Sequence, residues 1–154
     1  MRFDEEVLGF LRAADEHEVR LLMVGGGAVN FHGYQRHSAD IDFWIEPSPE
    51  NFPRLLRALR AIGLQVDELP GPVLRSEQNI SVKISPDLDI ELITRFDPGC
   101  TFEAAWARSE QAALEGQPVT RYRVMGYDDL VNSKVRSARP KDLLDVYELK
   151  RRKG

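Results

Sequence analysis

Cysteine and long apolar runs are scarce in this 154-residue chain. A single cysteine, Cys100, excludes an internal disulfide and a zinc site built from paired Cys-x-x-Cys motifs. The longest apolar run, residues 21–29, is too short to cross a bilayer. The first six residues carry acids where a secretory signal needs a basic end and an apolar core. These absences predict a cytoplasmic protein that does not associate with a membrane.

A large net charge of one sign is also missing, but the charge is unevenly distributed. The 25 acidic and 21 basic residues sum to −4, too little to require a nucleic-acid or membrane partner. Residues 134–153 hold eight basic and three acidic residues, net +5, whereas the preceding chain holds thirteen and twenty-two, net −9. This asymmetry predicts an anion-binding face near the C-terminus.

The remaining composition is typical of a globular protein, with 42% hydrophobic and 30% charged residues. The sequence contains no repeat or low-complexity segment. The length fits one domain, which we expect to span residues 1–154 and to bury its own core.

Hydrophobic periodicity predicts an α/β (α+β) chain. Helices are expected at 4–17, 28–32, from Ser48 as N-cap to 62, from Thr101 as N-cap through 106, and at 127–137 and 141–151. Strands are expected at 20–24, 40–45, 80–84, 88–93 and in a hairpin leading into 119–125, with only weak strand character over the loop-rich 64–79. These elements predict a mixed β-sheet flanked by helices, with two helices closing the chain.

Two acidic residues stand out on the strand predicted at 40–45. Asp40 and Asp42 are two residues apart, so their side chains share one face about 6.5–7 Å apart along the strand. Both can reach one divalent cation, or a pair of cations about 3.5–4 Å apart. Mg²⁺ is the natural occupant, since it takes one or two carboxylates and completes its shell with water and phosphate oxygens.

Glycines follow the preceding predicted strand. Backbone N–H groups in Gly25-Gly26-Gly27 can approach a phosphate closely because no side chains intervene. The strand at 88–93 offers a third carboxylate from Asp89 or Glu91, which lie on one face. Each feature alone has a plain alternative, an ordinary turn or a solvent-exposed sheet edge, but the combination favours a phosphate and metal site.

Four segments together match a known pattern. They are a Gly-Gly pair followed by a short helix and Arg36-x-Ser38-x-Asp40-Ile41-Asp42, then Phe102-Glu103-x-Ala105-Trp106, Asp129-Leu130-Val131-x-x-Lys134, and Arg139-Pro140-Lys141-Asp142-Leu143-x-Asp145. This pattern resembles the nucleotidyltransferase superfamily with the polymerase-beta-like fold, over about residues 20–150. More narrowly, it is similar to AbiEii-type and related minimal nucleotidyltransferases, often encoded as toxins or resistance enzymes.

The resemblance implies roles for particular residues. Asp40 and Asp42 would bind two Mg²⁺ ions, with Mn²⁺ as a substitute, together with a third carboxylate that helps activate the attacking hydroxyl. Glu91 fits the family's strand best, and Asp89 is the alternative. The nucleotide-binding residues would be Gly25, Gly26, Gly27, Arg36, Ser38, Lys134 and Lys141. For the two lysines, the alternative is pairing with Asp142 or Asp145 on a solvated helix.

The function implied is transfer of an NMP group from an NTP to an acceptor hydroxyl on tRNA, a small molecule or a protein, with release of pyrophosphate. The acceptor specificity would come from a homodimer, a cognate toxin–antitoxin partner or an open cleft. Two alternatives belong to other classes. One is a catalytically inactive module of the same fold acting as an antitoxin or binding partner, and the other is an unrelated α/β binding protein.

Overall fold

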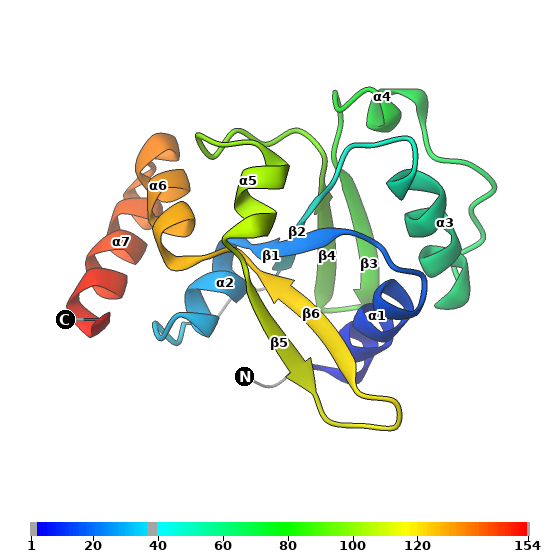
Figure 1. Ribbon diagram of the computed structural model, residues 1–154, viewed down its shortest axis with the longest axis horizontal. Helices are drawn as coiled ribbons and strands as arrows, with labels where there is room; N and C mark the ends of the chain where they lie inside the picture. Colours follow the sequence, from blue (N-terminus) through cyan, green and yellow to red (C-terminus); the bar gives the residue numbers. More distant parts are fainter. Residues whose placement is uncertain (1–2, 37–39, 154) are drawn as a thin grey trace.

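A computed structural model describes residues 3–36 and 40–153, and within them the chain forms one six-stranded mixed sheet flanked by helices (Figure 1). The strands are β1 (Leu21–Val24), β2 (Asp40–Ile45), β3 (Ile80–Ser85), β4 (Leu88–Ile93), β5 (Glu110–Leu114) and β6 (Thr120–Val124). The helices are α1 (Glu5–Glu16), α2 (Gly25–Phe31), α3 (Asn51–Ala61), α4 (Gly71–Leu74), α5 (Phe102–Ala107), α6 (Tyr127–Ser137) and α7 (Pro140–Lys153). The predicted α/β class, with a mixed sheet and two closing helices, is confirmed.

The sheet runs in the order β3-β4-β2-β1-β6-β5. The two central strands, β1 and β2, are antiparallel. On its other edge, β2 pairs in parallel with β4. On the other side, β1 pairs in parallel with β6 through one register pair, Met23 with Val124. All four residues of β1 are buried, as expected for a strand at the centre of the core.

Alternation along β2 decides which side chains face which helices. The Phe43 ring packs 5.4 Å from that of Phe10 on α1, whereas the Trp44 ring packs 5.1 Å from that of Phe102 on α5. Because side chains alternate between the faces of a strand, Asp42 lies on the same face as Trp44, the α5 side. Figure 1 shows α5, α6 and α7 on the opposite side of the central strands from α1.

Three sequence predictions differ from the structure. The helix expected at 28–32 begins at Gly25, because the chain passes from β1 directly into α2. The weak strand expected within 64–79 is wrong, since this segment contains α4, whose first turn holds Pro72, a residue that suits a helix start. The third helix begins at Asn51, although the Ser48 hydroxyl still accepts the Asn51 N–H at 3.2 Å.

The remaining boundaries agree within a few residues. Thr101 caps α5 as expected, accepting the Ala104 N–H at 3.1 Å. Pro140 begins α7 rather than merely separating it from α6, a position that proline favours because its missing N–H is not needed there. Within residues 3–36 and 40–153, no helix is long and apolar enough to cross a membrane.

Candidate functional site

The acidic residues of β2 and β4 stand side by side on the sheet. Asp42 is in register with Glu91, and Asp40 with Asp89, in the parallel pairing of the two strands. Neighbouring strands lie about 4.8 Å apart, and residues in register share a face. Four carboxylates therefore gather on the face that α5 and α6 border, which we call the acidic wall (Asp40, Asp42, Asp89 and Glu91).

Gly25, the first residue after β1, shapes the surroundings of Asp42. Its φ is +59°, in the left-handed region that favours glycine. A Cβ atom placed on Gly25 would overlap the Asp42 carboxylate. The turn from β1 into α2 thus packs its backbone directly against the Asp42 side chain, and only glycine fits there.

Burial, together with electrostatic repulsion within the acidic wall, raises the pKa of Asp42 above its usual value. Burial makes the largest contribution, followed by the charges of Glu91 and Asp40, while Lys134 and Lys141 act in the opposite direction. No cation among the described residues forms an ion pair with Asp42. The charged carboxylate is therefore disfavoured here unless a further positive charge is supplied.

The acidic wall has the donor chemistry of a divalent-cation site, since carboxylate oxygens are the ligands that Mg²⁺ prefers. Within the described ranges, however, no three or more His, Cys, Asp or Glu side chains lie close enough together to hold a metal ion. Asp89 pairs with Lys83, its register partner on β3, whose Nζ lies 3.7 Å from its carboxylate. Glu91 is the acidic residue of β4 that stands beside Asp42.

A cleft of about 680 Å³ opens between the acidic wall and the closing helices. Gly25 and Asp42 line it from the sheet side, and Lys134, Arg139 and Asp142 line it from α6 and α7. This volume falls within the range of about 300–1,000 Å³ that is usual for small-molecule sites.

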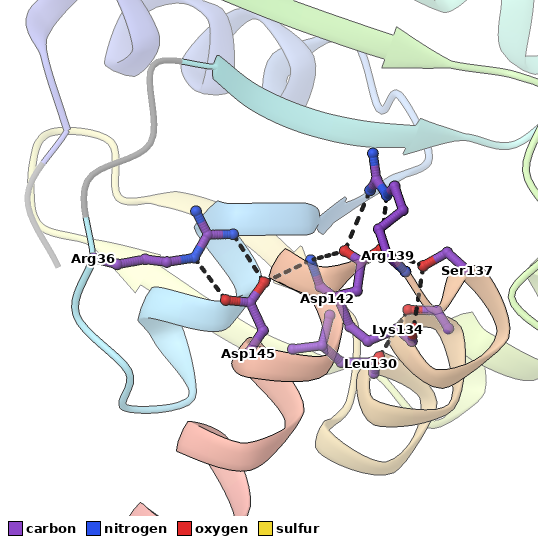
Figure 2. Close-up of polar contacts among 8 residues, drawn as sticks. Arg36, Leu130, Lys134, Ser137, Arg139, Asp142 and Asp145 are labelled. Atoms are coloured by element: carbon purple, nitrogen blue, oxygen red, sulfur yellow. Dashed lines mark hydrogen bonds and ion pairs between the residues drawn. The ribbon is translucent and has the colours of Figure 1, made fainter.

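The helical side of the cleft is a dense ion-pair network centred on Lys134 (Figure 2). The Lys134 Nζ lies 3.4 Å from an Asp142 carboxylate oxygen and 3.1 Å from one of Asp145. The Arg139 Nε donates to Asp142 at 2.7 Å, and the Ser137 hydroxyl donates to the same carboxylate at 2.8 Å. All three charged residues nearest the centre, Lys134, Asp142 and Asp145, are buried.

Arg36 extends this network from the segment after α2. Its guanidinium contacts both Asp145 carboxylate oxygens, at 2.9 and 3.0 Å. We call the five charged residues Arg36, Lys134, Arg139, Asp142 and Asp145 the basic wall. Three cations against two carboxylates give the basic wall a net charge of +1, and its members Lys134, Arg139 and Asp142 line the cleft.

The predicted site residues are thus brought together only in part. Gly25, Asp42 and Lys134 line the cleft. Gly26 and Gly27 are buried behind it within α2. Of the other residues predicted to bind the nucleotide, Lys141 is exposed on α7 and Arg36 is bound to Asp145. Ser38 lies outside the described residues.

Two hypotheses were open for Lys134, a contact to the triphosphate and an ion pair with Asp142 or Asp145. The structure contains the ion pairs. The expected setting was a solvated helix, and this is wrong, because only 7% of Lys134 is exposed. The cleft also contains Ser137 and Arg139, which were not predicted as site residues, although Arg139 belongs to one of the matched segments. The signal for Arg139 is its spacing three residues before Asp142 at a helix start, where i,i+3 side chains meet.

No protein-family model and no curated protein matches this sequence.

Proposed function

We propose that the protein is a Mg²⁺-dependent nucleotidyltransferase of the polymerase-beta-like fold. It transfers an NMP group from an NTP to an acceptor hydroxyl and releases pyrophosphate. One observation carries the proposal: Asp42 stands in register with Glu91 on one side of a cleft whose other side, the basic wall, has a net positive charge. A metal–triphosphate complex has charges of both signs, which suits a cleft with two such walls.

The acidic wall and the basic wall have different roles in the proposed reaction. Asp40, Asp42 and Glu91 would hold the metal, which would supply positive charge to offset the negative charge of the reacting oxygens. The acceptor oxygen forms a bond to the α-phosphorus as the bond to the β-phosphate oxygen breaks. Glu91 takes the hydroxyl proton, with Asp89 as the alternative base, and the electron pair of the broken bond leaves with pyrophosphate.

The basic wall and its neighbours receive the triphosphate. Lys134 holds a fixed positive charge at the cleft surface because Asp142 and Asp145 orient it. Lys141 is exposed on α7, and its positive charge acts to lower the pKa of Asp42. Gly25 lines the cleft and presents backbone there without a side chain.

A second candidate function rests on a specific feature of the same site. Lys134 is engaged by two carboxylates, and the described acidic residues form no three-ligand metal group. Both features suit an inactive module of this fold that acts as an antitoxin or binding partner. The acceptor in the active case is a hydroxyl of tRNA, a small molecule or a protein, with a homodimer or partner chain shaping its site.

The test is thermal unfolding with Mg²⁺ and each NTP, comparing the wild type with the double variant Asp40→Asn/Asp42→Asn. At an NTP concentration about 100 times Kd, binding adds about 2.7 kcal/mol, or about 5–10 °C for a chain of this size. Asp67→Asn/Asp87→Asn is the matched control, since both residues are exposed and lie outside the cleft.

A shift that needs Mg²⁺, is lost in the cleft variant and is retained in the control supports the proposal. Labelled NTP then identifies the acceptor and the released pyrophosphate. No shift with any NTP at millimolar concentration rejects the enzyme and favours the inactive module.

A further inference from the structure

A second pocket opens between β1 and β6, away from the cleft. These parallel strands share only the register pair Met23–Val124, and toward their amino ends they diverge (Figure 1). The opening has a volume of about 390 Å³ and is lined by four arginines: Arg20, which precedes β1, Arg54 on α3, and Arg121 and Arg123 on β6. We call it the arginine pocket.

The arginine pocket and the cleft lie at opposite ends of β1. Arg20 directly precedes this strand and Gly25 directly follows it. Four residues of strand separate the two sites, about 13 Å at 3.3 Å per residue. One ligand of ordinary size therefore does not fill both.

Most of the positive charge in the arginine pocket is not neutralised. Arg20 is paired with Glu46 at 2.8 Å and with Glu103 at 2.9 Å. In contrast, across residues 3–36 and 40–153 no carboxylate lies within ion-pair distance of Arg54, Arg121 or Arg123, all of which line the pocket. Three guanidinium groups without an ion-pair partner line this one pocket, and they favour an anion bound among them.

The Arg123 side chain is held in place by neutral partners. Its guanidinium donates to the Ser109 hydroxyl at 3.2 Å and to the Gln111 side-chain oxygen at 3.3 Å. It also lies 4.6 Å from the ring centroid of Trp106, which Arg20 approaches to 4.5 Å. Positioning by neutral groups keeps the charge available, and a guanidinium has five N–H donors, enough for these contacts and a ligand.

Two acidic residues also line the arginine pocket. Asp15 accepts the backbone N–H of Arg121 at 2.9 Å, and Glu18 is the other. With four lining arginines against these two carboxylates, the lining keeps a net positive charge, which favours an anionic ligand.

We propose that the arginine pocket binds a phosphorylated small molecule, with Arg121 and Arg123 contacting its phosphate groups and Arg54 adding charge. Guanidinium groups match phosphate oxygens with paired N–H donors, and the pocket volume lies within the small-molecule range. The proposal does not depend on the proposed nucleotidyltransferase activity, because it uses none of the residues of the cleft.

The experiment titrates inorganic pyrophosphate into the full chain without Mg²⁺, measuring heat and tryptophan fluorescence. Trp106 lines the arginine pocket, whereas Trp44 is buried and packs against Phe96 of the cleft, so the variants below assign a fluorescence change to one site. Arg121→Gln/Arg123→Gln should weaken binding by about tenfold or more, the loss typical of two charge-assisted hydrogen bonds. Arg12→Gln/Arg57→Gln removes the same charge from exposed positions outside the pocket and should leave the affinity within about twofold.

Arg136→Gln, which removes an exposed charge that lines the cleft, distinguishes the two sites. If it weakens pyrophosphate binding while the Arg121→Gln/Arg123→Gln variant binds normally, the ligand occupies the cleft and the proposal is wrong. Absence of saturable binding at millimolar pyrophosphate also overturns it. A short single-stranded RNA that binds more tightly than pyrophosphate through the same arginines, with a steep salt dependence, would replace the small molecule by a nucleic acid.

Discussion

The two walls of the cleft use the same side chain in opposite ways. Asp142, in the basic wall, is 0% exposed, yet its pKa falls to about 2. Burial acts to raise that pKa, but hydrogen bonds from Arg139 and Ser137 and the charge of Lys134 outweigh it. Asp42, in the acidic wall, is less buried, and its pKa is raised by burial and by the carboxylates beside it.

This comparison shows that hydrogen-bond and ion-pair partners, more than depth of burial, decide whether the pKa of an aspartate is lowered or raised. The basic wall is complete within the protein, so its aspartates serve the structure and orient Lys134. Asp42 in the acidic wall lacks a cation partner among the described residues, so its charge is available to a ligand. A carboxyl group whose pKa is perturbed in this way is characteristic of functional sites.

The largest expected effect comes from breaking the basic wall. Lys134→Met leaves the buried Asp142 and Asp145 with one cation fewer and should lower the free energy of unfolding by about 3–5 kcal/mol. Lys141→Met, on the exposed side of α7, is the matched control and should change it by less than about 0.5 kcal/mol. Urea unfolding of the three proteins measures both. Equal effects would mean that burial of Lys134 contributes nothing.

A second change acts where the chain meets the acidic wall. Gly25→Ala places a methyl group against the Asp42 carboxylate at a φ of +59°, and should destabilise the fold by about 1–3 kcal/mol. Gly9→Ala is the control, because Gly9 lies within α1 with open space around its Cα, and it should stabilise by about 0.5–1 kcal/mol. Opposite signs in thermal unfolding support the close packing of Gly25 against Asp42, and two stabilising changes would contradict it.

The low pKa of Asp142 predicts an acid-dependent loss of stability. Its folded pKa of about 2 lies below the ordinary 3.8, so between these values the unfolded state binds more protons. The corresponding contribution of about 2 kcal/mol is fully present above about pH 4 and is lost as the pH falls toward 2. Unfolding free energies of the wild type and Asp142→Asn, measured across this range, should converge at low pH. Parallel curves would show that Asp142 is not the group responsible.

The sequence predicted the placement of residues wherever a local rule decides it. Asp40 and Asp42 had to share a face because side chains alternate along a strand, and the structure places them so on β2. Thr101 had to begin a helix because its hydroxyl can accept an orphan N–H, and it does so at Ala104. Such rules need only a few neighbouring residues.

Properties that depend on distant segments were not available from the sequence. Whether Asp89 or Glu91 stands beside Asp42 depends on the register between β2 and β4, which lie almost fifty residues apart. The burial of Lys134 likewise results from the packing of α7 against α6, not from the local pattern. The helix α2 begins at Gly25 although glycine has a low helix propensity. The glycine itself is explained by a contact with another strand, because a Cβ atom there would overlap the Asp42 carboxylate.

The smallest expected effect is in the acidic wall, where removing a carboxylate should raise the stability of the fold instead of lowering it. Asp42→Asn removes a carboxylate whose pKa is raised by burial, Glu91 and Asp40, so its charge opposes folding at neutral pH. Without divalent cations, the variant should therefore unfold at a slightly higher temperature than the wild type. The wild type gains this stability only when the pH falls through the raised pKa. Adding Mg²⁺ should reverse the order, since only the wild type keeps the full set of carboxylates. A variant that is less stable than the wild type without metal would mean that the Asp42 charge is already satisfied within the protein, and the contrast between the two walls would fail.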